Sequence, residues 1–499
     1  MLKDIVSRFL LVFLIIETIL QETTIYRRRQ KLRAMENGLD LGGAYEGTLE
    51  RIKAQSGEKA LGMAALMWIS HSRRPLKVDE ICHSIAIRAG SNDLNSDDVP
   101  AISVLLGCCQ GFVTIERGTS TVRLIHFSLQ EYLYTHPDLF NRAHSTMAEI
   151  CLTYLIFQHV KGLSAGPSPD PRDTPFLEYS SLYWGTHMRM ERSDHAKTLA
   201  LQLLDQFNSH ISAKLLWESI AEKLISWEFL EGRTPDRKGF STLHCISYFG
   251  IANVASTLIK MRRWDLNQTD SQGMTLLIWA ARYGHEEVVK LLLRKKHIQP
   301  DQQDANSSRT ALSWAARNGY EGVVRLFLRP QFVNPGSNGR RWGKVVQAAG
   351  LLIGMRYVNP DSSSKSGRTP LMRAAANGHE GVVKLLLGQK DVNPDTPNTK
   401  NGRTPLSLAA KNGHEGIVKL LLERKDVNPD TPDTGYGRTP LSWAAKKGHE
   451  GVVKLLLGRK DVNPHILNKS GQTPLTLATE NGHRRIVELL QAPLSRNIP

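Results

Sequence analysis

The sequence predicts a mainly α-helical chain: a small N-terminal unit of helices with one β-hairpin, a helical spacer, and a long helical solenoid. Three observations predict this order. The segment GRTPLSLAAKNGHEGIVKLLLERKDVNP (402–429) returns almost unchanged at Gly367 and Gly437. Residues 112–116 and 121–126 alternate between apolar and polar side chains, as paired strands do. A linker rich in Gly, Pro and Ser lies between these two regions, at 161–173.

The repeated segment sets the fold of residues 239–499. Looser copies begin at Gly239, Gly273, Ser308 and Gly471, so that successive starts lie 34, 35, 59, 35, 35 and 34 residues apart. A nearly fixed period of this size predicts a stacked array of repeats. Each copy predicts two helices. Because one helical hairpin cannot bury its own apolar stripe, it has to pack on its neighbours.

Each helix of the repeat has a clear beginning and end. Thr404 is expected to cap the first helix, and Pro405 stands at a position where a missing N–H is harmless. Gly413 and His414 end that helix and turn the chain. The second helix carries an apolar stripe at helical spacing, made of Ile417, Val418, Leu420, Leu421 and Leu422.

The G-x-T-P-L opening, the Ala-Ala pair, the Gly-His dipeptide and the V-V-x-L-L-L run resemble ankyrin repeats. The resemblance implies an α-solenoid that binds a protein ligand through the residues before G-x-T-P-L and the pair before Gly-His. The usual His after T-P-L is Ser407 or Ser442 here, so a weaker hydrogen bond is expected at that place. The protein-binding residues implied by the resemblance are Arg282, Tyr283, Arg317, Asn318, Thr399, Lys400, Asn401, Lys411, Asn412, Asp433, Thr434, Tyr436, Lys446 and Lys447.

The long interval between Ser308 and Gly367 indicates a degenerate repeat at 336–366. Leu351–Gly354 aligns with the second helix of the other copies, whereas GSNGRRW (336–342) stands in place of the first helix. A repeat that lacks one helix loses part of both interfaces with its neighbours. The sequence therefore predicts that the array opens in two blocks, 239–330 and 367–499, with its weakest point at the join.

Two kinds of ring recur at fixed repeat positions. The Gly-His histidines cannot share a metal ion, because packed helices lie ~8–10 Å apart and zinc needs nitrogens about 2 Å away. We expect them to form hydrogen bonds between neighbouring loops instead. The tryptophans are expected to pack, with ligand contact as the alternative. The residues are His285, His379, His414, His449 and His483, and Trp279, Trp314 and Trp443.

The net charge of +16 and the pI of about 9.6 raise nucleic acid or an acidic membrane as partners. One repeat position in the second helix holds a cation throughout, which indicates a solvated outer stripe and no dedicated site. The stripe consists of Lys290, Arg325, Lys384, Lys419 and Lys454. The cluster Arg27, Arg28, Arg29, Lys31 and Arg33 is expected to be an exposed helix face, with a nuclear import signal as the alternative.

The cysteines and the N-terminus indicate the compartment. The five cysteines are an odd number without C-x-x-C spacing, which is typical of buried thiols in a reducing environment. The apolar run at 9–20 is interrupted by Glu17 and is shorter than the ~20 residues of a spanning helix. We therefore expect a buried amphipathic helix, no membrane partner and a cytoplasmic protein, with the nucleus as the alternative location.

The segment LDLGGAYEGTLERI (39–52) resembles the one that follows the NACHT module in fungal NOD-like receptor proteins, and residues 1–56 resemble the end of that module. The resemblance implies an ATPase upstream, absent from this chain, and a NACHT-containing partner. In the string nearest to a P-loop, 339–345, the glycines are one residue too close and Val345 cannot bind magnesium. We expect no cofactor and neither binding nor hydrolysis of ATP.

Residues 57–160 predict a winged helix, with helices at 60–70, 75–86 and 99–109 before the hairpin. The sequence resembles the winged-helix domain named after GPI inositol-deacylase, whose signature reads HFSLQEYL (126–133) here. Ser128 and Glu131 are expected to form a capping box at the start of a short helix. That interpretation is favoured over a catalytic one for His126, Ser128 and Glu131, since no G-x-S-x-G elbow occurs.

Contact with DNA is not favoured by this unit. The helix that would enter the groove, 99–109, carries no Lys or Arg, and none occurs between Arg88 and Arg117. Base readout and phosphate contact both need donors and positive charge. We expect the wing to pack against protein, and we expect no nucleic-acid partner.

After the linker at 161–174, residues 175–238 predict a helical spacer. Its segment PFLEYSSLYWGTHMR (175–189) resembles the spacer of the same fungal family, and its aromatic residues predict a core or a docking face. The sequence as a whole predicts a non-enzymatic interaction protein, which the resemblance associates with non-self recognition. A DNA-binding or transcription-linked protein is one alternative. An enzyme is the other, opposed by the lack of convergent catalytic or metal spacing.

Overall fold

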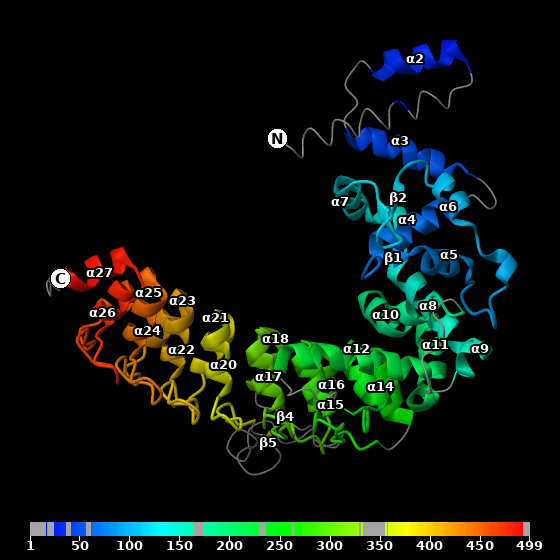
Figure 1. Cartoon of the computed structure of the whole chain (residues 1–499). Coiled ribbons are helices and arrows are strands. Elements are labelled where there is room, and N and C mark those ends of the chain that lie inside the picture. The colour runs from blue at the N-terminus through cyan, green and yellow to red at the C-terminus, as the bar shows by residue number, and fades with distance from the viewer. Residues whose placement is uncertain are drawn as a thin grey trace, which may run out of the picture. The chain divides into compact units, whose positions relative to one another are not determined.

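The computed structural model describes residues 16, 24–35, 41–55, 61–163, 173–228, 236–261, 264–328, 331–332, 355–356 and 358–492 (Figure 1). The chain divides into two compact units, residues 1–234 and 235–499. Helix α2 (Ile25–Met35) exposes Arg27 and Arg29, as expected of a solvated helix face. The apolar run at 9–20 lies outside the described residues except for Ile16. No helix within the described ranges is long and apolar enough to span a membrane.

The first unit begins with the predicted helices and hairpin. Its elements are α3 (Leu41–Lys53), α4 (Leu61–His71), β1 (Leu76–Lys77), α5 (Val78–Ala86), α6 (Ile102–Cys108), β2 (Val113–Glu116), β3 (Thr121–Leu124) and α7 (Phe127–Thr135). The strands form an antiparallel sheet in the order β1-β3-β2, with Ile115 and Leu76 both opposite Val122. Strand β1 was not predicted, because two residues are too few to show alternation.

Helix α3 packs on the helices and sheet that follow it. Tyr45, Leu49 and Ile52 share one face and are buried. The Tyr45 ring meets Phe112 edge to face at 5.7 Å, and its hydroxyl lies 2.8 Å from Ser128 Oγ. The segment at 39–52 therefore completes the core of the winged-helix unit.

The start of helix α7 differs from the prediction. His126, not Ser128, is the N-cap: it is extended, and its Nδ1 accepts the backbone N–H of Ser128 at 3.3 Å. Ser128 lies inside the first turn and bonds His126 and Tyr45, while Glu131 is exposed. The predicted capping box of Ser128 and Glu131 is wrong, because the helix begins one residue earlier and a ring nitrogen serves as the acceptor.

The helical spacer shares a core with the helix before the linker. The spacer contains α10 (Leu177–Met190), α11 (Asp194–Asp205) and α12 (Ile211–Glu228). Before the linker stand α8 (Ala143–Ile156) and α9 (Gln158–Lys161), and α8 packs against both α10 and α11. Phe176, Tyr179 and Trp184 are fully buried, which confirms that the spacer aromatics form a core. All five cysteines are free thiols, and all but the half-buried Cys108 are buried.

The second unit stacks helix pairs in one row (Figure 1). The first helices are α13 (Thr242–Phe249), α15 (Leu276–Arg282), α17 (Ala311–Asn318), α20 (Pro370–Asn377), α22 (Pro405–Asn412), α24 (Pro440–Lys447) and α26 (Pro474–Glu480). The second helices are α14 (Ala252–Met261), α16 (Glu286–Leu293), α18 (Glu321–Leu328), α21 (Glu380–Leu387), α23 (Glu415–Leu422), α25 (Glu450–Leu457) and α27 (Arg484–Gln491). Each helix packs on its counterpart in the next repeat.

The local signals of the repeat act as predicted. Thr404 caps α22 by accepting the N–H of Ser407 at 3.2 Å, and Pro405 occupies the first turn. Gly413 ends the helix with a φ of +79°. Ile417, Val418 and Leu421 are buried in the stack, while the cations of the outer stripe are exposed except for the half-buried Lys290.

The stack is continuous at the long interval between repeats. Helix α17 packs directly on α20, and α18 packs on α21. The His379 ring donates to the Arg317 carbonyl at 2.9 Å, as the other repeats do across their own joins. The described helices on either side of the interval are thus in contact, while the opening of the array in two blocks at this join stays a prediction. Residues 333–354, which include GSNGRRW and Leu351–Gly354, lie outside the described residues.

The extra residues form an insertion that leaves the stack and returns to it. Strand β4 (Gln331–Phe332) pairs antiparallel with β5 (Met355–Arg356), so the two ends of the insertion lie together. Beyond it, Lys365 Nζ donates to the Ala305 carbonyl at 2.6 Å and restores the contact between neighbouring hairpins. The start-to-start interval of 59 exceeds the usual 35 by 24 residues, fewer than one whole repeat.

Candidate ligand-binding surface of the repeats

The predicted binding residues differ in their access to solvent. Arg282 and Asp433 are buried. The exposed residues are Thr399, Lys400, Asn412, Thr434, Tyr436 and Lys447, and the half-buried ones are Tyr283, Arg317, Asn318, Asn401, Lys411 and Lys446. The exposed residues lie in the hairpins and at the ends of the first helices, which keeps them available to a ligand.

Two asparagines of the predicted set join neighbouring repeats. Asn318 Nδ2 donates to the Arg282 carbonyl at 2.7 Å, and Asn412 Nδ2 donates to the Ala376 carbonyl at 2.7 Å. These bonds satisfy carbonyls at the end of the preceding first helix, which have no partner within that helix. A structural role therefore accompanies any ligand contact that these amides make.

Asp433 is the centre of a buried polar group. Its Oδ2 accepts Trp443 Nε1 at 2.8 Å and lies 3.3 Å from Arg403 Nε, while Oδ1 accepts the N–H of Tyr436 at 2.6 Å. With its acceptors occupied inside the fold, this carboxylate positions the hairpin and the indole. Of the predicted residues in this hairpin, the exposed Thr434 and Tyr436 are better placed than Asp433 to contact a ligand.

The three tryptophans pack, as predicted. Trp279, Trp314 and Trp443 are at most 4% exposed. Each indole N–H donates to an aspartate of the hairpin just before its helix, namely Asp270 at 2.9 Å, Asp304 at 3.0 Å and Asp433 at 2.8 Å. Burial raises the pKa of Asp270, although its hydrogen bonds act in the opposite direction.

Cations surround two of the buried indoles. The guanidinium carbons of Arg282, Arg309 and Arg317 lie 4.1, 4.5 and 5.4 Å from the Trp314 ring centre. Arg403, Arg438 and Lys411 lie 4.4, 4.8 and 5.1 Å from that of Trp443. Such cation–π contacts hold the positive groups in fixed places. The first helices thus carry a second set of cations, apart from the outer stripe.

The histidines of Gly-His form the predicted ladder. In every case Nε2 donates to a carbonyl of the preceding repeat, and the distances lie between 2.7 and 3.2 Å. No group of metal-ligating side chains suited to an ion is found within the described ranges. The ladder therefore joins repeats.

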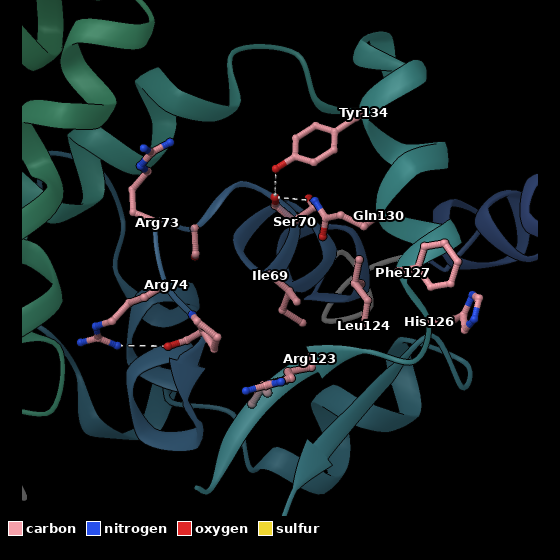
Figure 2. A pocket seen from close by; sticks show the side chains of 13 residues that line it. Ile69, Ser70, Arg73, Arg74, Arg123, Leu124, His126, Phe127, Gln130 and Tyr134 are labelled. Carbon is pink, nitrogen blue, oxygen red and sulfur yellow. Dashed lines mark hydrogen bonds between the residues drawn. The ribbon is translucent and has the colours of Figure 1, made fainter. Parts of the chain in front are cut away.

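The winged-helix unit contains a separate cavity of about 460 Å³ (Figure 2). Gln130 and Tyr134 of α7 reach across to the Ser70 carbonyl at 2.8 and 3.1 Å, which ties α7 to the end of α4. Arg73 and Arg123 also line the cavity, with the exposed Phe127. Exposed aromatic rings beside arginines suit contact with a protein. His126 and Ser128 are joined by a third polar group, the Tyr45 hydroxyl. Because this group is not a carboxylate, the three residues do not form a catalytic triad.

Comparison with known proteins agrees with this geometry. The family model described as ankyrin repeats (3 copies) matches residues 209–304, 243–339, 343–433 and 425–497, together more than half of the chain. The chain belongs to the ankyrin-repeat family. Residues 49–153 match the model of the GPI inositol-deacylase winged helix domain.

The other comparisons concern single proteins. The crystal structure of the human ASB11 ankyrin repeat domain is 22% identical, over 51% of this chain and 99% of that chain, with a TM-score of 0.39. No curated protein matches the chain. The assignment of the ankyrin array therefore rests on the family model and on the stacked helix pairs.

The ankyrin array departs from its family after T-P-L, with a visible consequence. In the first repeat, His244 occupies this place, and its Nε2 donates to the Met274 carbonyl of the next repeat at 3.2 Å. At Ser442 the short hydroxyl instead bonds Thr439 of its own repeat at 3.1 Å. The predicted weakening is thus a lost link between repeats.

Sequence reasoning missed several cations of the ankyrin array, namely Arg309, Arg368, Arg373, Arg403 and Arg438. Four of them share the position before T-P-L or its equivalent, and Arg373 replaces the tryptophan of other repeats. This recurrence was a visible signal. The role of these arginines could not be predicted, because it depends on which residues of the next repeat face each of them.

Proposed function

We propose that this chain is a non-enzymatic interaction protein whose ankyrin array binds a protein ligand on its hairpins and first helices. The observation that carries the proposal is the side chain of Tyr436. It is 54% exposed at the tip of a hairpin whose base is fixed by the buried Asp433 and Trp443. An exposed ring on a rigid support is the kind of group that contributes most to protein interfaces.

Neighbouring groups support this surface. The Arg438 guanidinium lies 4.5 Å from the Tyr436 ring centre and holds one face of it, and Trp443 meets the ring edge to face at 6.0 Å. Lys447, in the same repeat, is exposed at the end of α24. The Tyr436 ring and the Lys447 ammonium group therefore both face solvent on neighbouring parts of the array. In this proposal one ligand contacts both side chains.

The test replaces Tyr436 with a photo-crosslinking phenylalanine derivative in the full chain and identifies the captured protein by mass spectrometry. Affinity for that protein is then measured by calorimetry. Tyr436→Ala and Lys447→Ala should each weaken it about tenfold, as expected of central interface residues. Lys454→Ala, on the outer stripe of the same repeat, is the matched control. Unchanged affinity for both test variants would remove the proposed surface.

The cellular context of the proposal is that of fungal NOD-like receptors. It is supported by the segment at 39–52 and by the winged-helix match at 49–153. In that context a NACHT-containing protein is the expected partner, and the cytoplasm is the expected location. Co-purification with a NACHT protein from the same genome, and imaging of a fluorescent fusion, test the two expectations separately.

The winged helix and the pI of about 9.6 favour one alternative, a DNA-binding protein. Against it, α6 carries no cation, and Asp97 and Asp98 lie just before it. A mobility-shift titration with random duplex DNA decides between the two. Binding that weakens steeply with salt would support DNA contact.

A further inference from the structure

The arginine that precedes T-P-L faces a residue of the following hairpin, as Arg403 shows. The Nε of Arg403 lies 3.3 Å from Oδ2 of Asp433, in the hairpin that leads into the next repeat. Both side chains are at most 10% exposed. Within this hairpin the backbone N–H of Asp433 donates to the Arg438 carbonyl, and this hydrogen bond marks the position of the residue. The same backbone bond marks the equivalent residues Asp270, Asp304, Ser364, Asn398 and Asn468, of which only the two aspartates carry a charge.

In two successive repeats the equivalent residue is neutral. The N–H of Ser364 donates to the Arg368 carbonyl, and that of Asn398 donates to the Arg403 carbonyl. Relative to Arg368, Asn398 therefore occupies the position that Asp433 occupies relative to Arg403. Its side chain is an amide and offers no carboxylate. Within the described residues the Arg368 guanidinium has neither an ion pair nor a hydrogen bond. Asn398 is 3% exposed, and its Nδ2 has no acceptor.

Arg373 adds a second unbalanced charge at the same place. It stands where Trp314 and Trp443 stand in other repeats and is 5% exposed. One terminal nitrogen donates to Ser364 Oγ at 2.8 Å, but its Nε has no acceptor. Burial and the nearby charges of Arg309, Arg368 and Arg317 together lower its pKa to about 9, with Asp304 opposing them. A buried guanidinium is costly when no anion is paired with it.

The cations that surround Arg373 reach solvent. Arg309, Arg317, Arg368 and Lys411 are half-buried, so part of each side chain is open to a ligand. Burial and the charges of Arg403, Lys447 and Arg368 lower the pKa of Lys411, which shows that these groups share one electrostatic environment. We call Arg309, Arg317, Arg368, Arg373 and Lys411 the Arg373 cluster. Positive groups that repel one another in this way create a potential that attracts an anion.

We propose that the Arg373 cluster binds a carboxylate-bearing segment of the protein ligand, at the first helices of the repeats that begin at Ser308, Gly367 and Gly402. The proposal rests on the proposed function and names the chemistry of the partner. A carboxylate from the ligand supplies the negative charge that Asp433 supplies for Arg403. Guanidinium groups bind carboxylates through two parallel hydrogen bonds, which gives a short acidic segment a defined position.

The arrangement favours an acidic peptide over nucleic acid. The cations are half-buried and grouped around one buried residue, whereas backbone contact with nucleic acid uses many exposed cations along a path. A segment with a few glutamates or aspartates supplies the small number of carboxylates that such a compact group of cations can bind.

The test measures binding of a labelled hexaglutamate peptide to the full chain by fluorescence anisotropy at low salt. Arg373→Leu should weaken binding at least tenfold, and its fold is expected to persist because Leu408 occupies the same position in the next repeat. Arg325→Leu removes the same charge from the outer stripe and should bind as the wild type does. Equal affinity of the two variants would overturn the proposal.

A second variant keeps the test decisive if Arg373→Leu unfolds. Ser364→Asp introduces the carboxylate that Asp270, Asp304 and Asp433 provide in their own hairpins, beside Arg373, whose terminal nitrogen lies 2.8 Å from Ser364 Oγ. It should raise the melting temperature and abolish hexaglutamate binding together. Retained binding in this variant would count against the cluster. Tighter binding of single-stranded DNA than of hexaglutamate, lost in the same variant, would replace the acidic peptide by nucleic acid and overturn the proposal.

The outcome is separable from that of the proposed function. Crosslinking at Tyr436 reports a protein ligand whether or not the peptide binds. A captured partner without any effect of Arg373→Leu refutes the Arg373 cluster alone. Hexaglutamate binding through Arg373, with no partner captured at Tyr436, refutes the surface proposed for the hairpins and leaves the anion site in place.

Discussion

The imidazole of His449 lies against the α-carbon of Gly413 in the preceding repeat, so close that a Cβ at 413 would be 2.6 Å from Nδ1. The ring is held there by its Nε2, which donates to the Lys411 carbonyl at 3.0 Å. The same pair recurs at Gly378 with His414 and at Gly448 with His483. Glycine and histidine of the Gly-His motif thus act between repeats, each on a different neighbour.

Gly413→Ala should destabilise the array by about 1.5–3.5 kcal/mol. The left-handed backbone alone costs an L-residue ~1–2 kcal/mol, and the added methyl group displaces the His449 ring and its hydrogen bond, worth ~0.5–1.5 kcal/mol. Urea unfolding followed by circular dichroism measures the difference. Gly416→Ala is the control: its nearest neighbour is the movable carboxylate of Glu380, and alanine favours the helix by ~1 kcal/mol. Equal loss in both variants would contradict the role given to His449.

Deletion of residues 333–354, with a two-residue turn joining β4 to β5, should leave the array folded and cooperative. The strands already hold the ends of the insertion together, and α17 packs on α20 without it. Loop length alone has a small effect, ~0.6 kcal/mol for each doubling. A single thermal transition within a few degrees of the wild type is expected.

Brief trypsin treatment of the native, intact chain tests the same join. In the intact chain we expect the first cut at Arg340 or Arg341, as predicted from the sequence. The two fragments should remain associated on a sizing column, because the helices on either side of the insertion pack together. Separation of the fragments would support the prediction of two independent blocks.

The first unit should lose stability as the pH falls below 6.5. His187 is fully buried, with Nε2 2.9 Å from the Tyr179 hydroxyl and Nδ1 2.9 Å from His144 Nδ1. Burial, together with the charges of His144, Arg73 and His71, lowers its pKa to about 3. Since the folded pKa is depressed, the unfolded chain takes up the proton first. Stability is full above pH 6.5 and declines toward pH 3.

The expected loss from this residue between pH 7 and pH 5 is about 2 kcal/mol, from an unfolded pKa of about 6.5. His187→Gln should flatten the dependence of the unfolding free energy on pH, measured by denaturant titration of the full chain. His136→Gln, at an exposed site, should leave it unchanged. An equally steep profile in His187→Gln would show that other groups control acid unfolding.

Calorimetry with ATP and magnesium should show no saturable binding in the micromolar range. The sequence has no G-x-x-x-x-G-K-[ST] string to cradle the phosphates and bind the metal. A measured site would point to a nucleotide-binding arrangement of another kind.

The sequence by itself determined the repeat and its local geometry. Helix caps such as Thr404, the turn at Gly413 and the apolar stripe of α23 depend on residues a few positions apart, and the period of the pattern exposes them. Stacking followed from the same pattern, because a single hairpin leaves its stripe uncovered. The ladder of histidines could be predicted on the same grounds, since spacing alone excluded a shared metal ion.

Only the tertiary structure decided what distant residues do to each other. A short strand such as β1 and the ring nitrogen that caps α7 have no periodic signal of their own. The 24 extra residues resembled a damaged repeat until the packing of α17 on α20 showed an insertion. The Arg373 cluster arises because Ser364 and Asn398 stand at the position where Asp433 provides a carboxylate for Arg403. Charge balance depends on distances in space, and these are fixed only once the repeats are stacked.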